Sequence, residues 1–193
     1  MIRLALLRHG HTHWNRAGRI QGRSDIPLDD GARADLAGLT LPSPWDQADL
    51  WSSPLQRATE TAEIVANREP HTAPELTEMF WGDWEGLHGL DLKSDPNSGF
   101  RDIEQWGWDY QPHGGETPIQ VWTRIEPWIN TLQSDTVAVR HIGIILIILP
   151  RAHHVASDGP VSVRLTRTTW TILTTESVNP TTQPADIRTY KRG

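Results

Sequence analysis

The sequence predicts a three-layer α/β fold, with a mostly parallel central sheet and helices on both faces. Short apolar runs typical of buried strands alternate along the chain with segments whose apolar residues recur at helical spacing. Such alternation is typical of parallel sheets that helices cover on both sides. A chain of 193 residues is also the size of one domain and long enough to bury a substantial core.

The strands are predicted from short apolar runs bounded by polar or turn-forming residues. Residues 2–7, 50–52 and 136–139 form three such runs, and the first and last are followed by an Arg-His pair. Near the end of the sequence, alternating apolar residues predict two further strands that pair with each other. These are the segment with Val161, Val163 and Leu165, and residues 170–173.

Two helix starts carry the same local signal: a capping residue, then proline, then glutamine three residues after the cap. They are Ser53-Pro54 with Gln56, and Thr117-Pro118 with Gln120. Pro127 is expected to kink or shorten the second helix, because a proline inside a helix removes a hydrogen bond. A shorter helix is predicted from Asp29 to Leu39.

We expect these elements to form a single domain over residues 1–174. Within it, residues 86–116 are rich in Gly, Pro, Asp and Trp, a composition that predicts an irregular lid or wall. Residues 175–193 are rich in Thr and Pro and are predicted to form a polar C-terminal tail.

Composition limits the classes of function. The chain has no cysteine, which excludes disulfides and thiolate metal sites and agrees with a cytoplasmic location. A net charge of −6 disfavours nucleic acid as a partner, because such proteins present a basic face. The longest apolar run, 142–149, is well below the ~20 residues of a membrane span, so no membrane association is expected. The sequence leaves the oligomeric state open, with a homodimer as one option.

Two predicted strands end in the same pair of residues, Arg8-His9 and Arg140-His141. Ligands of parallel sheets bind at the carboxyl ends of the strands, so we expect both imidazoles to reach one pocket. Arg57 follows the strand at 50–52 and can point to the same end.

This set of side chains suits phosphoryl transfer. A neutral imidazole can attack phosphorus, and nearby arginines disfavour its protonated form. Arginine forks pair with phosphate oxygens, and a carboxylic acid must protonate the departing oxygen. The sequence therefore predicts a small phosphorylated compound as substrate.

Five segments, in order, resemble the signatures of the histidine phosphatase superfamily, which includes the cofactor-dependent phosphoglycerate mutases. The resemblance spans residues 2 to about 146. The segments are Leu7-Arg8-His9-Gly10-His11-Thr12-His13-Trp14-Asn15 with Gly18 to Leu28; Ser52 to Ala62; Leu76 to Gly86; His113 to Thr117; and Val137 to His141.

The resemblance implies a role for each matching residue. His9 would be the nucleophile, and Glu78 the proton donor that later activates water. Arg8, Arg57 and His141 would hold the transferred phosphoryl group. Four further positions would line the phosphate pocket: Thr12, Asn15, Gln21 and Gly22. The same resemblance places Glu85 in a structural turn and gives Glu116 the task of shaping the loop before a helix. It implies no metal and no organic cofactor.

Three positions depart from the family pattern. His11 stands where Glu or Gln is usual, Ile142 replaces a small or polar residue, and Leu146 stands where the pattern has Arg. These departures bear on the protonation of the pocket and on the geometry around His141.

Four functions agree with these observations. We expect a hydrolase of small phosphomonoesters that works through a phosphohistidine. A mutase is the first alternative, but it needs extra cations, and Arg101 is the only arginine between residues 69 and 123. The second is a metal-dependent hydrolase built on His9, His11 and His13, which alternate after a strand. The third is a relative that binds phosphate without turning it over.

Overall fold

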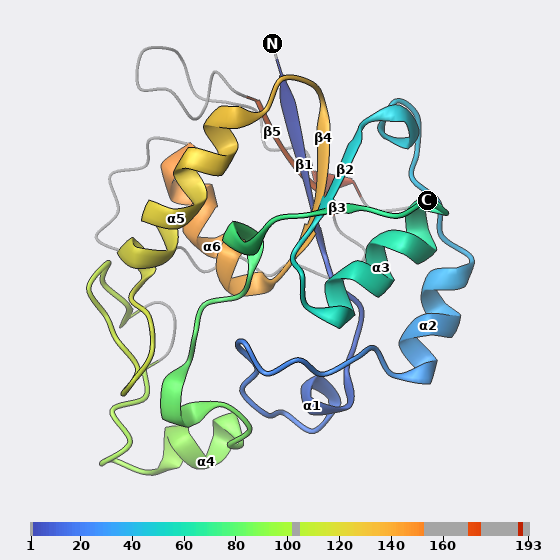
Figure 1. The fold of residues 1–193 in the computed structure, drawn as a ribbon. Helices are drawn as coiled ribbons and strands as arrows, with labels where there is room; N and C mark the ends of the chain where they lie inside the picture. Colours follow the sequence, from blue (N-terminus) through green and yellow to red (C-terminus); the bar gives the residue numbers. More distant parts are fainter. Residues whose placement is uncertain (1, 102–104, 153–169, 175–188, 191–193) are drawn as a thin grey trace.

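A computed structural model describes residues 2–101, 105–152, 170–174 and 189–190 of the chain. Its centre is a six-stranded sheet with the strand order β3-β2-β4-β1-β5-β6 (Figure 1). β1, β2, β3 and β4 run parallel to one another, whereas β5 pairs antiparallel with β1, and β6 antiparallel with β5. The strands span Arg3–Arg8 (β1), Asp49–Ser52 (β2), His71–Thr72 (β3), Thr136–Arg140 (β4), Trp170–Thr174 (β5) and Thr189–Tyr190 (β6).

Helices cover the two faces of the sheet, so the predicted three-layer α/β fold is correct. α2 and α3 lie on one side and α5 and α6 on the other, while the short α1 and α4 lie beyond one end of the strands (Figure 1). The helices span His13–Arg16 (α1), Asp30–Ala37 (α2), Gln56–Ala66 (α3), Gly89–Ser94 (α4), Pro118–Thr131 (α5) and Ile142–Ala152 (α6). Short 3₁₀ turns lie in the connections at Trp45–Gln47, Pro74–Leu76 and Gly82–Trp84.

Two buried apolar clusters hold the layers together. Side chains alternate across a strand, so β1 contributes Leu4 and Leu6 to the cluster under α5 and α6 and Ala5 and Leu7 to the cluster under α2 and α3. All four side chains are at most 4% exposed. The same alternation sends Arg8, two residues after Leu6, toward the α5 and α6 side.

The predicted start of α5 is confirmed. The Thr117 side chain accepts a hydrogen bond from the Gln120 backbone N–H (3.2 Å), and the Gln120 side chain accepts one from the Thr117 N–H (2.9 Å). This reciprocal pair is a capping box. The helix continues past Pro127 to Thr131, so the expected shortening at the proline does not occur.

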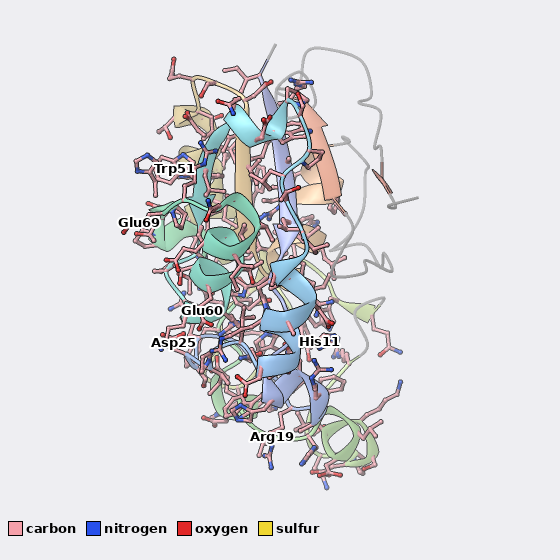
Figure 2. All side chains as sticks on the ribbon, turned by 90° about the vertical axis from the view of Figure 1, so that its right-hand side faces the viewer. His11, Arg19, Asp25, Trp51, Glu60 and Glu69 are labelled. Atoms are coloured by element: carbon pink, nitrogen blue, oxygen red, sulfur yellow. The ribbon has the colours of Figure 1, made fainter. Side chains whose placement is uncertain are left out.

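The predicted start of α3 was wrong. Ser53 accepts a bond from the Leu55 N–H (3.3 Å), and the helix begins only at Gln56. The Gln56 N–H instead donates to the carboxylate of Asp25 (2.8 Å), which lies in a distant loop, shown in Figure 2 near the start of α3. The Asp25 carboxylate thus caps the helix, because backbone N–H groups at a helix start need an acceptor.

Two expectations fall partly or wholly outside the described residues. The strand predicted around Val161, Val163 and Leu165 lies outside them, and so does most of the 175–193 tail. The strand expected at 170–173 is present as β5, and it pairs with β1. Within 86–116, the described residues contain the short helix α4 between irregular stretches.

Removing the α5 cap should destabilise the protein. We expect Thr117→Ala to lower the free energy of unfolding by about 1 kcal/mol, because the Gln120 N–H loses the side-chain oxygen that accepts its hydrogen bond. Urea unfolding of the two proteins measures the difference. Thr123→Ala on the same helix is the control, since Thr123 is exposed and bonds only a carbonyl of its own helix. An equal loss in both variants would contradict the capping role.

Candidate active site

The site begins where β1 and β4 end. These strands pair in parallel with Arg8 opposite Arg140, so the next residues, His9 and His141, leave the sheet side by side. The His9 N–H continues the ladder by donating to the Arg140 carbonyl (2.9 Å). The two imidazole rings lie with their centroids 5.0 Å apart, and both are buried.

Hydrogen bonding fixes the tautomer of His9. Its Nδ1 lies 2.6 Å from the Gly10 carbonyl oxygen. A carbonyl can only accept, so Nδ1 carries the hydrogen and the lone pair of the neutral ring is on Nε2. The nitrogen that could attack an electrophile is therefore Nε2.

Arg57 enters from the first turn of α3. Its guanidinium donates to the carbonyls of Gly22 (2.6 Å) and Ser24 (2.9 Å), and the side chain is fully buried. Burial lowers the pKa of Arg57 to about 10, which still leaves it charged at neutral pH. The carbonyls of loop 22–24 thus orient the Arg57 guanidinium. The positive charge of Arg57 in turn lowers the pKa of His141.

Glu78 is buried beside these groups, with only 3% of its surface exposed. One carboxyl oxygen accepts the Met79 N–H (2.9 Å), and the other accepts the Gly143 N–H (3.1 Å) at the start of α6. Burial raises the pKa of Glu78, against the opposing effect of these N–H groups and of the Arg57 and Arg8 charges. The carboxyl group therefore keeps its proton to a higher pH than an exposed glutamate does.

The contact between Glu78 and α6 requires glycine. A Cβ atom at Gly143 would lie 2.5 Å from a Glu78 carboxyl oxygen, well inside van der Waals contact. The glycine lets the backbone approach closely enough to donate its hydrogen bond.

His141 is held neutral. Its pKa lies well below the ordinary value, first because of burial and then because of the positive charges of Arg57, His9 and Arg140. Neither ring nitrogen has a hydrogen-bond partner among the described residues. His141 can thus offer one N–H to an incoming anion.

Three of the residues expected to line the pocket bind one another. The Thr12 hydroxyl and the Asn15 amide both donate to the Gln21 side-chain oxygen, at 3.0 and 2.9 Å. Thr12 also caps α1. The Gln21 amide nitrogen is buried and has no partner in the described part of the chain. Gly22, the fourth, contributes its carbonyl to Arg57 and has no room for a side chain beside Glu85 and Trp81.

Arg140 is a residue that the prediction of the site left out. Its side chain is fully buried, and none of its three guanidinium nitrogens has a partner within the described ranges. Burial lowers its pKa to about 9, against the attraction of Glu78. The sequence could have identified Arg140 as a site residue, because it is the first residue of the second Arg-His pair.

The three alternating histidines do not form a metal centre among the residues described. His9 is buried at the end of β1, whereas His13 begins α1 and is exposed. No group of three or more His, Asp or Glu side chains suited to a metal ion occurs in the described ranges. Figure 2 shows His11 in the connection that leads from β1 to α1.

Fold and site together define an α/β protein of the phosphoglycerate mutase type, with paired imidazoles at the carboxyl ends of parallel strands. Residues 4–184 match the histidine phosphatase superfamily (branch 1), and the chain belongs to this family.

Similar proteins include several phosphatases. An adenosylcobalamin/alpha-ribazole phosphatase of Salmonella typhimurium is 32% identical over 78% of this chain and 79% of its own length. A glucosyl-3-phosphoglycerate phosphatase of Mycolicibacterium vanbaalenii is 31% identical over 67% of this chain and 59% of its own length.

Among solved structures, a phosphoglycerate mutase from Thermus thermophilus superposes with a TM-score of 0.71 at 28% identity, covering 96% of this chain and 98% of its own. The chain belongs to this family and its relatives include named phosphatases, so we identify it as a phosphatase. Among the described residues, no helix is both long and apolar enough to cross a bilayer.

Gly143→Ala should impair catalysis without unfolding the protein. The new methyl group must displace the Glu78 carboxyl, and a misplacement of about 1 Å costs on the order of 100-fold in rate. Steady-state kcat on an alkyl phosphate measures the loss. Gly38→Ala is the control, because nothing lies within 4 Å of the added Cβ. Unchanged activity in Gly143→Ala would contradict the close contact.

The lowered pKa of His141 predicts how stability depends on pH. The unfolded chain protonates this histidine near 6.5, whereas the folded state keeps it neutral, so stability should fall as the pH drops through about 6.5. We expect His141→Gln to flatten this dependence in urea unfolding between about pH 7.5 and about pH 5. The exposed His13→Gln variant should keep the wild-type dependence. Identical pH profiles for all three proteins would rule out a neutral, buried His141.

Proposed function

We propose that this protein hydrolyses the phosphomonoester of a small metabolite through a phosphohistidine on His9. The observation that carries the proposal is the buried pair of imidazoles, 5.0 Å apart, together with the buried Glu78 carboxyl, whose pKa is raised by burial. These groups supply a nucleophile, an N–H donor and a proton donor in one small volume.

In the first step, the phosphoryl group lies between Arg8, Arg57 and His141. The His9 Nε2 lone pair forms a bond to phosphorus as the bond to the leaving oxygen breaks. Glu78 gives its proton to that oxygen, so the product leaves as an alcohol. The Nδ1–H bond to the Gly10 carbonyl supports the positive charge that develops on the ring.

In the second step, water replaces the alcohol. Glu78, now a carboxylate, takes a proton from the attacking water, and the new oxygen–phosphorus bond forms as the bond to His9 breaks. Inorganic phosphate leaves, Glu78 is protonated again and His9 is neutral. Atoms and charges balance with water alone, so this route needs no metal or organic cofactor.

Water is favoured as acceptor over a second substrate molecule. Met79, which follows the acid, is fully buried, so that position offers the substrate no cation. Arg101, the only arginine between residues 69 and 123, is exposed in the wall segment. A mutase must grip a monophosphate product through such cations. The test is the mutation of 3-phosphoglycerate in the presence of a bisphosphate primer. A mutation rate that matches the hydrolysis rate would contradict water as the preferred acceptor.

The relatives support a small phosphorylated metabolite as the substrate class. One relative is an adenosylcobalamin/alpha-ribazole phosphatase and another a glucosyl-3-phosphoglycerate phosphatase, so chemically different small molecules are associated with this family. A cytoplasmic location stays a prediction from the composition.

Two substitutions test the proposed roles. His9→Ala should abolish hydrolysis of p-nitrophenyl phosphate and the appearance of acid-labile phosphate on the protein. Glu78→Gln should still form the intermediate, but slowly, with losses of roughly 10²- to 10⁴-fold on an alkyl phosphate that needs its oxygen protonated. Rapid quenching after mixing with labelled substrate measures the intermediate. A His9→Ala variant with wild-type turnover, or a wild type without turnover, would overturn the proposal in favour of another nucleophile or a non-catalytic binder.

A further inference from the structure

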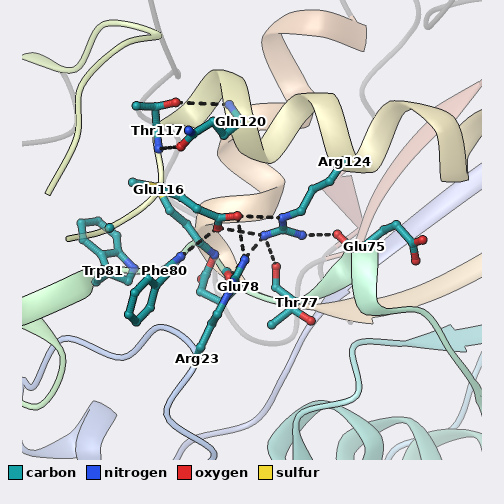
Figure 3. Close-up of polar contacts among 12 residues, drawn as sticks. Arg23, Glu75, Thr77, Glu78, Phe80, Trp81, Glu116, Thr117, Gln120 and Arg124 are labelled. Carbon is teal, nitrogen blue, oxygen red and sulfur yellow. Dashed lines mark hydrogen bonds and ion pairs between the residues drawn. The ribbon is translucent and has the colours of Figure 1, made fainter.

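A cluster of charged side chains surrounds the acid segment, residues 77–81, which carries Glu78 (Figure 3). Glu116 lies between two arginines at its centre: one carboxyl oxygen is 2.6 Å from Arg23 Nη2 and 3.3 Å from Arg124 Nε. The other is 3.4 Å from Arg124 Nη2 and accepts the Phe80 N–H at 3.0 Å. The proposed reaction uses none of these side chains.

Arg124 reaches from α5 to the backbone that carries the acid. Its guanidinium donates to the carbonyls of Glu75, Thr77 (2.6 Å) and Glu78 (3.3 Å). Residues 77–81 form no helix or strand, so no regular ladder fixes their conformation. Arg124 and its partner Glu116 instead hold this segment at three backbone positions, the carbonyls of Thr77 and Glu78 and the N–H of Phe80. Arg124 also holds the Glu75 carbonyl just before the segment.

The same carboxylate connects the acid segment to the loop that orients Arg57. Arg23 lies in that loop, between the two residues whose carbonyls accept from Arg57. Glu85 makes a second connection, accepting the N–H groups of Arg23 and Ser24 (both 2.7 Å) and of Trp81 (3.3 Å). The carboxylates of Glu116 and Glu85 therefore tie the segment that carries Glu78, the proton donor, to the loop that orients Arg57.

The pair of Arg124 and Glu116 is largely shielded from water, with side chains 20% and 17% exposed. Solvent screens such a shielded ion pair less than an exposed one, and the planar fork of arginine fits several oxygens at once. Lysine in the same place could not bond three carbonyls and a carboxylate in a fixed geometry.

We propose that Arg124, acting with Glu116, is a positioning residue that sets the place of the Glu78 carboxyl relative to the leaving oxygen. This inference rests on the proposed function and deepens it. Arg124 donates its hydrogen bonds to the backbone that carries Glu78, so we assign it no contact with the substrate. Its charge is also among those felt by His141, and Arg124→Lys keeps that charge while it alters the hydrogen-bond geometry.

The leaving group separates positioning from general stability. An alkyl alcohol leaves only if Glu78 protonates it, whereas p-nitrophenolate is a stable anion that leaves unaided. A misplaced acid therefore slows alkyl phosphates selectively. A merely damaged fold lowers both rates by the same factor.

The experiment compares kcat/KM for β-glycerophosphate and for p-nitrophenyl phosphate in the wild type and three variants. This ratio reports the first step, through departure of the alcohol, and leaves out the second step, in which Glu78 serves both substrates alike. In Arg124→Gln we expect the alkyl rate to fall on the order of 100-fold while the aryl rate changes little. Arg124→Lys should recover part of the alkyl rate, because it keeps the charge. Glu116→Gln, which keeps the shape of the side chain and removes its charge, should show the same selectivity with a smaller loss.

Arg33→Gln is the matched control, since Arg33 pairs with Asp30 and Glu60 on the outer helices and should leave both rates unchanged. Equal losses on the two substrates in both Arg124→Gln and Glu116→Gln, or no loss on either, would overturn the positioning role. A wild type that turns over neither substrate and traps no phosphate on His9 would overturn the proposed function, and this inference with it.

Discussion

The site depends on the parallel pairing of β1 with β4. With Arg8 opposite Arg140, the chain leaves both strands at the same level, and His9 and His141 follow as neighbours. β2 pairs with β4 in the same direction, so the turn that leads to Arg57 opens at this edge as well. A shift of the β1–β4 register by one residue would send one of the two imidazoles to the opposite face of the sheet, because side chains alternate along a strand.

Burial then gives these residues their chemical character. Removal from water disfavours charge, which raises the pKa of Glu78 and keeps His141 neutral. The arginines stay charged despite the same cost, and Arg140 has no partner within the described ranges. A site with surplus buried positive charge is suited to bind a phosphate dianion, because the ligand offsets the desolvation of the cations.

Local signals made part of this structure predictable. The cap of α5 was readable because Thr117, Pro118 and Gln120 lie within one turn, and the two Arg-His pairs were readable because each ends a strand. The start of α3 was missed because its cap comes from Asp25, a contact that closes 31 residues of chain and leaves no local pattern. Strand order and the position of Glu78 behind Gly143 likewise depend on tertiary contacts. Glu78 was singled out only through the family resemblance.

Two of the three departures from the family pattern, Ile142 and Leu146, lie in α6, the helix whose backbone holds the acid. At the start of α6 it is the Gly143 N–H that holds the acid, so the bulky Ile142 before it leaves this hydrogen bond intact. Leu146, where the pattern has Arg, is buried, and Arg140 supplies a buried cation at the end of β4. The groups that hold Glu78 are thus backbone N–H donors on its carboxyl oxygens and Arg124 on its carbonyl, none of which requires a particular side chain at 142 or 146. A glycine at 143 and a planar cation at 124 are the stricter requirements, since only they allow the close approach and the simultaneous bonds that fix the acid.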